Sequence, residues 1–143
     1  MPVVPKNQHV PVTPGEHVLR RIPNNKDWYK ESLAEPVQRV AFEPRKTDTA
    51  GLSVFRELFV SAAKVAAGGP GRAGYYVSRL RIADLLMLGL TVVPDPQANE
   101  LPGHALIPEL SYSSMLRDRS ASKAFQRELA KLASRAIVFR PGH

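Results

Sequence analysis

The sequence has no cysteine among its 143 residues. It therefore forms no disulfide bond, offers no thiolate to a metal ion, and has no cysteine nucleophile. It also has no run of about 20 apolar residues, the length that crosses a membrane; the apolar stretch at residues 83–90 is interrupted by Asp84 and Gly89. The first fifteen residues lack the basic start and apolar centre of a signal peptide. These absences predict a cytoplasmic protein without a membrane partner.

Several motifs that carry chemistry are missing as well. The four histidines show neither the H-x-x-x-H nor the H-E-x-x-H spacing of a metal site, and no serine lies in a G-x-S-x-G turn. The stretch GGPGRAG at residues 68–74 does match G-x-G-x-x-G. A dinucleotide loop, however, leaves a strand and opens a helix, whereas this stretch follows an expected short helix and precedes a strand. We interpret it as a connector, and the sequence predicts no catalytic motif, no metal and no cofactor.

Proline and glycine are abundant, with 13 and 9 residues, which indicates short elements and frequent turns. Four prolines fall in residues 1–15, and proline fixes φ and lacks an amide donor. We expect an extended tail there, or alternatively a strap that lies on the domain or on a partner. Residues 16–143 have the length of a single domain. The sequence is 43% hydrophobic, which is enough for a core.

Hydrophobic patterning predicts an α+β domain: a mixed sheet of short strands, two short helices and one longer amphipathic C-terminal helix. Phe125, Leu129, Leu132 and Ala136 form one narrow stripe on that last helix. Strands are expected at residues 17–22, 37–42, 51–55, 75–80, 90–93, 104–107 and 137–139. Helices are expected from Ser61 to residue 67, at 81–88 and at 121–136.

Five short segments, taken in order, resemble a widespread group of small bacterial proteins that has no assigned activity. They are Leu19-Arg20-Arg21, Ala41-Phe42, Leu52-Ser53-Val54, the VVPDP stretch at residues 92–96, and His104-Ala105-Leu106-Ile107. The resemblance spans about residues 18–139. It implies kinship and no particular reaction.

The anion-binding candidates are Arg20, Arg21, Arg56 and His104. Successive strand residues point to opposite faces, so one of Arg20 and Arg21 faces inward and needs a carboxylate or a carbonyl. We expect either an ion pair with Asp48, Glu57 or Asp84, or a clamp for a phosphate or carboxylate. ADP-ribosyl-transfer folds carry an arginine on an early strand, a serine on a later strand and a glutamate, and this sequence offers the same order. One hypothesis is therefore a small NAD- or phosphate-handling enzyme that uses Arg20 or Arg21, Ser53, Glu57 and His104.

The net charge of +7 favours polyanionic partners. Lys123, Arg127, Lys131 and Arg135 recur every four residues along the last helix, on the side away from its apolar stripe. Such a row is either a solvated face or a surface that follows a phosphate backbone. Nucleic-acid binding is therefore a second hypothesis.

The absence of recognisable catalytic machinery favours a non-enzymatic accessory or interaction module of a bacterial multi-component system, with another protein as partner. Trp28 and Tyr29 lie in a polar stretch expected to be a loop. Together with the proline-rich tail, they are the candidate contacts to that partner.

Overall fold

The computed structural model describes residues 6–67 and 74–141. Of the glycine-rich stretch only Gly74 is among them, so the predicted connector lies outside the described residues. Six strands form one sheet in the order β4-β5-β2-β1-β3-β6. The strands are β1 His17–Pro23, β2 Leu52–Arg56, β3 Tyr75–Arg81, β4 Val93–Pro94, β5 His104–Ile107 and β6 Ile137–Phe139. The helices are α1 Ala62–Ala67, α2 Ile82–Met87, α3 Tyr112–Arg117 and α4 Arg119–Ser134, with 3-10 turns η1 Lys6–His9, η2 Arg39–Phe42 and η3 Pro108–Leu110.

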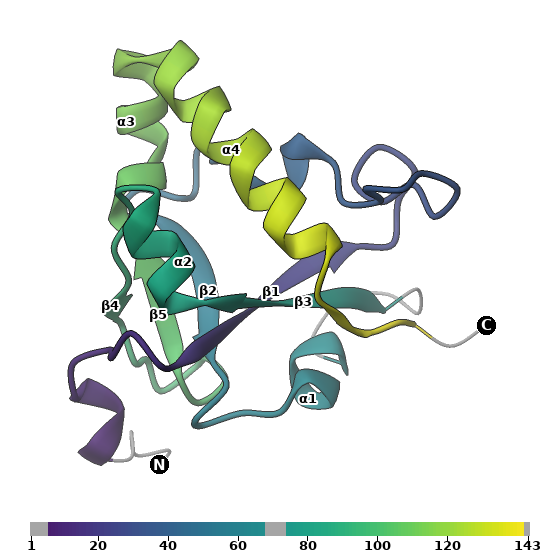
Figure 1. Cartoon of the computed structure of the whole chain (residues 1–143). Helices are drawn as coiled ribbons and strands as arrows, with labels where there is room; N and C mark the ends of the chain where they lie inside the picture. The colour runs from purple at the N-terminus through teal and green to yellow at the C-terminus, as the bar shows by residue number, and fades with distance from the viewer. Residues whose placement is uncertain (1–5, 68–73, 142–143) are drawn as a thin grey trace.

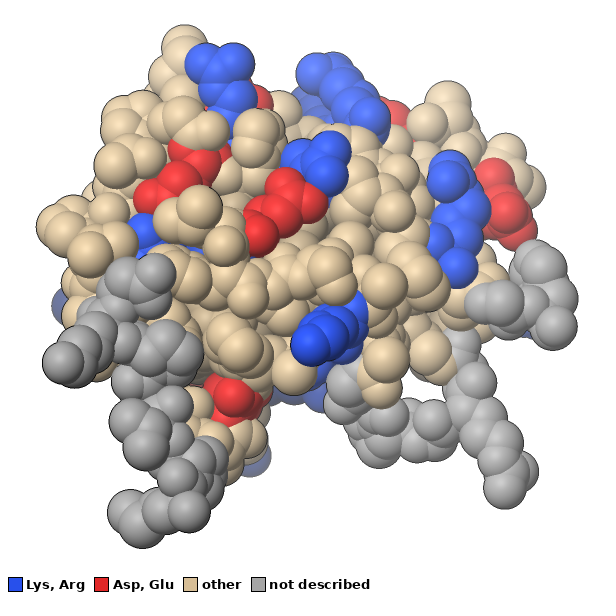
Figure 2. All heavy atoms as spheres, turned by 90° about the horizontal axis from the view of Figure 1, so that it is seen from below, with Lys and Arg blue, Asp and Glu red and all other residues tan. Residues whose placement is uncertain are grey.

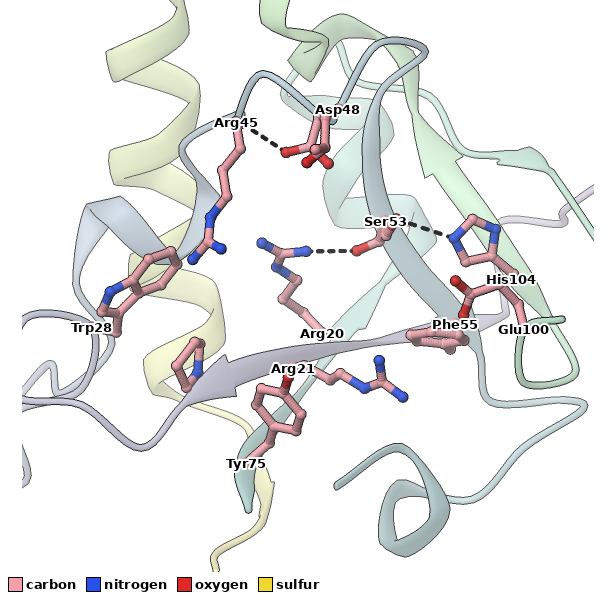
Figure 3. A pocket seen from close by; sticks show the side chains of 12 residues that line it. Arg20, Arg21, Trp28, Arg45, Asp48, Ser53, Phe55, Tyr75, Glu100 and His104 are labelled. Atoms are coloured by element: carbon pink, nitrogen blue, oxygen red, sulfur yellow. Dashed lines mark hydrogen bonds between the residues drawn. The ribbon is translucent and has the colours of Figure 1, made fainter. Parts of the chain in front are cut away.

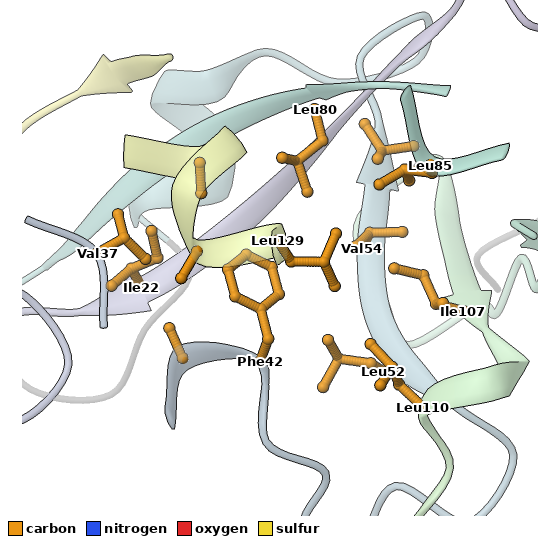
Figure 4. Packing of buried hydrophobic residues seen from close by; sticks show 14 of the residues in the cluster. Ile22, Val37, Phe42, Leu52, Val54, Leu80, Leu85, Ile107, Leu110 and Leu129 are labelled. Atoms are coloured by element: carbon orange, nitrogen blue, oxygen red, sulfur yellow. The ribbon is translucent and has the colours of Figure 1, made fainter. Parts of the chain in front are cut away.

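The helices cover both faces of the sheet: α4 and α2 lie on one side and α1 on the other (Figure 1). Alternation along β1 sends Val18 and Ile22 into the core under α4, and Leu19 into a smaller core beside α1. In the larger core Leu129 of α4 lies between Phe42 of η2 and the sheet (Figure 4). The sheet is thus buried on both faces.

The predicted α+β class and the longer C-terminal helix are confirmed. All paired strands run antiparallel, where a mixed sheet was expected. The reason is topological: β2 and β3 run in the same direction, but β1 lies between them and pairs with both. The last helix begins at Arg119 rather than at residue 121, because the Asp118 side chain accepts a hydrogen bond from the Ala121 amide and caps it.

Two predicted strands are wrong. Residues 37–42 end in the 3-10 turn η2, in which the consecutive residues Ala41 and Phe42 are both buried; a strand would send one of them to the opposite face. In the stretch 90–93 only Val93 joins a strand, with Pro94, while Leu90 is buried in the core. Helix α3 was not predicted from the sequence.

The N-terminal segment is tied to the domain through Arg56, which is completely buried. The guanidinium binds both carboxylate oxygens of Glu16, at 2.9 Å each. It also donates to the carbonyls of Gln8, Val10 and Pro11. The strap alternative therefore describes residues 8–16 better than a free tail does, and the turn η1 adds regular structure where none was expected.

The β-sheet is split between β1 and β2, and this split creates the site described below. Strand β1 pairs with β3 along its whole length, from His17 to Pro23. It pairs with β2 only at Val18 and Leu19. Beyond Leu19 the two strands diverge, so their facing edges open a gap within the sheet. Within the described residues, no helix has the length and apolarity needed to cross a membrane.

Candidate functional site

A cleft of about 240 Å³ opens where β1 and β2 diverge. Three arginines line it: Arg20 and Arg21 from β1, and Arg45 from the loop after η2. Further lining side chains include Trp28, Asp48, Ser53, Tyr75, Glu100 and His104 (Figure 3). The cleft therefore combines guanidinium groups, aromatic rings and a serine–histidine pair.

Arg20 lies at the centre of the cleft and is held by carbonyl groups (Figure 3). Its Nε and Nη2 donate to the Ala41 carbonyl at 3.1 and 2.7 Å, and its Nη1 donates to the Ser53 carbonyl at 2.8 Å. The expected ion pair is thus replaced by main-chain acceptors. These bonds require the η2 turn, because it aims the Ala41 carbonyl at β1.

Arg21 points to the opposite face of β1, as predicted. Its Nε donates to the Val65 carbonyl of α1 at 2.9 Å, and its guanidinium carbon lies 4.8 Å from the ring centre of Phe55 and 5.4 Å from that of Tyr75. Arg45 stacks in a similar way on Trp28, at 4.7 Å. Both guanidiniums are thus oriented by ring faces, and these contacts do not use up their hydrogen-bond donors.

The positive charge in the cleft is only partly compensated. Burial lowers the pKa of Arg20 to about 10; Asp48 opposes this shift, while Arg45 and Arg21 add to it. Arg20 remains protonated at neutral pH, but its charged form is destabilised. Within the described residues, none of the three arginines forms a salt bridge with a carboxylate. A bound anion would stabilise the charged form of Arg20, and it would offset both the desolvation of this guanidinium and its repulsion by Arg21 and Arg45.

Ser53 and His104 form the polar wall of the cleft. The Nε2 atom of His104 lies 3.1 Å from Ser53 Oγ. On the other side of the ring, Nδ1 lies 2.9 Å from the carbonyl oxygen of Asp95 and 3.2 Å from its Oδ2. The edge of the ring packs against Phe55, with centroids 5.5 Å apart. The histidine is therefore buried but borders the cleft.

Two residues predicted for this site lie elsewhere. Glu57 forms a two-point ion pair with Arg79, at 2.8 and 2.7 Å. Arg56 is not available to a ligand, because its five N–H donors already meet Glu16 and three carbonyls. Its neighbour Gly103 has φ +84°, and a Cβ there would lie 2.8 Å from the Arg56 carbonyl oxygen. Glycine at 103 thus lets the start of β5 approach the backbone of Arg56 at the end of β2.

The two aromatic residues proposed as partner contacts differ in their surroundings. Tyr29 is only 6% exposed and stacks on Tyr76, with ring centroids 3.6 Å apart. It is therefore a core residue that leaves little of its surface exposed for a contact. Trp28 is half-buried, packs against the core and lines the cleft beneath Arg45. A contact of Trp28 with a partner stays a prediction.

The four cations of α4, Lys123, Arg127, Lys131 and Arg135, are all exposed. Lys131 makes a surface contact of 3.5 Å with Glu128. Their helix lies on the far side of the sheet from α1 (Figure 1). On the face seen from below, basic and acidic side chains are scattered among each other (Figure 2). Whether the α4 row binds a nucleic acid stays a prediction.

Sequence reasoning did not find Arg45, Tyr75, Asp95 or Glu100 as members of one site. Their positions in loops and on β3 are brought together only by the pairing of distant strands. The one available signal was the motif VVPDP. Its Asp95 follows Pro94, which pairs with Ala105, and Ala105 is the neighbour of His104 in β5. Among the described residues no cluster of histidine, aspartate and glutamate has the arrangement of a metal site.

Comparisons with protein-family models, with curated proteins and with solved structures found no match. The resemblance to small bacterial proteins therefore stays a prediction. Any function must be argued from the residues of the cleft.

Proposed function

We propose that this protein is a nucleotide-handling enzyme that binds NAD, or a closely related pyrophosphate-bearing nucleotide, in the cleft between β1 and β2. The observation that carries the proposal is a set of three guanidiniums around one cleft, none of which forms a salt bridge with a carboxylate in the part of the chain that the structure describes. It corresponds to the NAD- or phosphate-handling alternative from the sequence, with a corrected set of residues.

The arginines favour a phosphate ligand. A guanidinium offers paired N–H donors that match phosphate oxygens, and such charge-assisted bonds are stronger than neutral ones. Arg21 and Arg45 are oriented by aromatic faces, so little side-chain entropy is lost on binding. Arg20 contributes positive charge from the floor of the cleft while its own hydrogen bonds remain with Ala41 and Ser53.

The rings and the acidic side chains favour a ligand with two unlike ends. Trp28 and Tyr75 line the cleft, each in contact with one arginine guanidinium, and such flat surfaces suit the planar rings of a nucleotide. Glu100 lies beside His104 (Figure 3). NAD carries a negative pyrophosphate and a positive nicotinamide ring, and Glu100 offers a negative charge for the latter. At about 240 Å³ the cleft is smaller than ordinary ligand pockets, which enclose roughly 300–1,000 Å³, so it would hold one part of a dinucleotide while the rest extends over the rim.

The order of residues around the cleft agrees with this assignment. Arg20 is on the early strand β1, Ser53 on β2, and Glu100 in the loop before β5. An arginine, a serine and a glutamate in this order correspond to the arrangement of ADP-ribosyl-transfer folds noted above. The glutamate is Glu100 rather than Glu57. A shared order of residues does not by itself imply a shared function, so the proposal rests on the arginines.

Isothermal titration calorimetry with NAD, ADP-ribose, AMP, nicotinamide and inorganic phosphate tests the proposal. We expect one site that binds NAD and ADP-ribose, phosphate more weakly, and tighter binding at low salt because charges dominate the contact. Binding should also stabilise the folded protein, by about 2.7 kcal/mol at a ligand concentration 100 times the Kd. The melting temperature should therefore rise. If neither NAD nor ADP-ribose binds at low salt, the proposal is wrong.

A variant of α4 and a binding assay with nucleic acid separate the other two hypotheses. A variant with Arg127→Met and Lys131→Met on α4 removes two positive charges far from the cleft and should leave NAD binding unchanged. If instead labelled DNA or RNA binds in a salt-sensitive way that this variant loses, the basic row of α4 is the functional surface. If no nucleotide and no nucleic acid binds, the accessory-module hypothesis is favoured.

A further inference from the structure

The hydrogen bonds around His104 determine which nitrogen carries the proton. Both groups near Nδ1, the carbonyl and the Oδ2 atom of Asp95, accept hydrogen bonds at neutral pH. Nδ1 must therefore be the protonated nitrogen of the neutral ring. Nε2 then has a free electron pair, and its neighbour at 3.1 Å, Ser53 Oγ, must donate its proton to it.

This arrangement has the geometry of an activated serine. A nucleophile is recognised when its hydroxyl contacts a base and a third group orients that base. Ser53 is the hydroxyl, His104 the base and Asp95 the orienting group. Asp95 is itself fixed, because its amide donates to the His104 carbonyl at 2.9 Å, and the edge contact with Phe55 limits rotation of the ring. Ser53 is half-buried and lines the cleft.

We propose that Ser53 is a catalytic nucleophile that accepts the ADP-ribosyl group of NAD bound in the cleft. This inference rests on the proposed function, and it names the reaction of the same site. Binding of the nucleotide does not need an activated serine, because the proposed phosphate contacts come from the arginines.

The reaction is a substitution at the ribose carbon that bears nicotinamide. The bond between this carbon and the ring nitrogen breaks, and the electron pair leaves with nicotinamide, which becomes neutral. A bond forms between the same carbon and Ser53 Oγ, and the serine proton moves to His104 Nε2. The charge balances, since the positive charge lost from the nicotinamide ring appears on the imidazolium, where the Asp95 side chain stabilises it. No oxidant, reductant or metal is needed.

The test mixes the full chain with NAD, quenches at short times, and measures three quantities. Intact-mass spectrometry with peptide mapping detects an ADP-ribosyl adduct and its position, chromatography measures released nicotinamide, and calorimetry with ADP-ribose measures binding. We expect an adduct on Ser53 that forms together with nicotinamide. In Ser53→Ala the adduct should be absent, and in His104→Gln its rate should fall at least about 100-fold, the lower range for loss of a general base.

Two further variants separate chemistry from structure. Asp95→Asn should slow adduct formation while the Kd for ADP-ribose stays unchanged, as expected for a positioning residue. Ser113→Ala replaces an exposed serine outside the cleft and should behave as wild type. Thermal unfolding of each variant confirms that it is folded.

The outcomes distinguish this inference from the proposed function. If ADP-ribose binds but NAD yields no adduct on Ser53, or if Ser53→Ala releases nicotinamide at the wild-type rate, the nucleophile assignment is wrong while the binding site stands. If ADP-ribose does not bind, the proposed function is wrong and this inference is rejected with it.

Discussion

Replacing Arg21 and Arg45 together by methionine is expected to weaken NAD binding at least about 100-fold. Hydrogen bonds to charged groups contribute about 1.5–3 kcal/mol each, and 1.4 kcal/mol corresponds to a factor of ten in affinity. Methionine keeps an apolar stem for packing on Tyr75 and Trp28. The loss should therefore report on the guanidinium groups rather than on the walls of the cleft.

Matched variants make this measurement specific. Arg127→Met with Lys131→Met changes the net charge by the same amount on α4, and we expect less than a threefold change in Kd. Replacing Arg21 and Arg45 by lysine keeps the charge but loses the planar fork, so its Kd should lie between those of wild type and the methionine variant. If the double methionine variant of the cleft and that of α4 weakened NAD binding equally, only the overall charge would attract the ligand.

Replacing Arg56 by methionine is expected to lower the free energy of unfolding by about 3–5 kcal/mol. Removing one partner of a buried ion pair leaves the other charge without compensation, and here it also leaves three carbonyls of the strap without their donor. Denaturant unfolding measures the change. As a control, Arg79→Met breaks the partly exposed Arg79–Glu57 pair and should cost no more than about 1 kcal/mol. Equal costs for the two variants would show that the buried contacts between Arg56 and the strap stabilise the fold no more than a partly exposed ion pair does.

The Arg56–Glu16 pair also predicts a pH dependence. Burial tends to raise the pKa of Glu16, but hydrogen bonds from Arg56 and Thr13 and the charge of Arg56 bring it below the ordinary 4.5. A lowered pKa means that the folded state binds this proton less readily than the unfolded state. Stability from Glu16 is therefore fully present above pH 4.5 and is lost as the pH falls through the folded pKa. Melting curves of wild type should decline over this range more steeply than those of Glu16→Gln.

The local pattern of the sequence was sufficient for several elements. Alternation along β1 placed Arg20 and Arg21 on opposite faces, and the apolar stripe identified α4. Of the stripe only Leu129 is buried, while Phe125 and Leu132 are half-buried. The buried side of α4 also takes in Gln126, Ala130 and Ala133. Both signals depend on residues near each other in the chain, where the backbone period alone decides which side chains share a face. The strand at His104–Ile107 followed from the same kind of evidence.

Other features depend on contacts between distant segments and had no local signal. Residues 37–42 alternate as a strand would, but burial of Ala41 and Phe42 together in the core selected a 3-10 turn. Tyr29 lies in a polar stretch, yet it stacks on Tyr76 of β3. Hydrophobic period describes one element at a time, so tertiary packing overrides it at such positions.

The candidate site was predictable in part. The sequence grouped Arg20, Arg21, Ser53 and His104, all of which line the cleft. It also included Glu57 and Arg56, which are bound to Arg79 and Glu16. A list of charged residues does not reveal which charges neutralise one another. That information comes from the register of β1, β2 and β3, because it determines which side chains face each other.

The most direct test of the nucleotide site is an NMR titration that follows the Nε–H signals of the arginines as ADP-ribose is added. Assignment comes from single arginine-to-lysine variants. We predict that the signals of Arg20, Arg21 and Arg45 shift with one common Kd. The signals of Arg127 on α4 and of Arg135, which caps the C-terminal end of α4, should stay in place. Shifts confined to the arginines of α4, or no shift at saturating ligand, would contradict the assignment of the cleft as a nucleotide site.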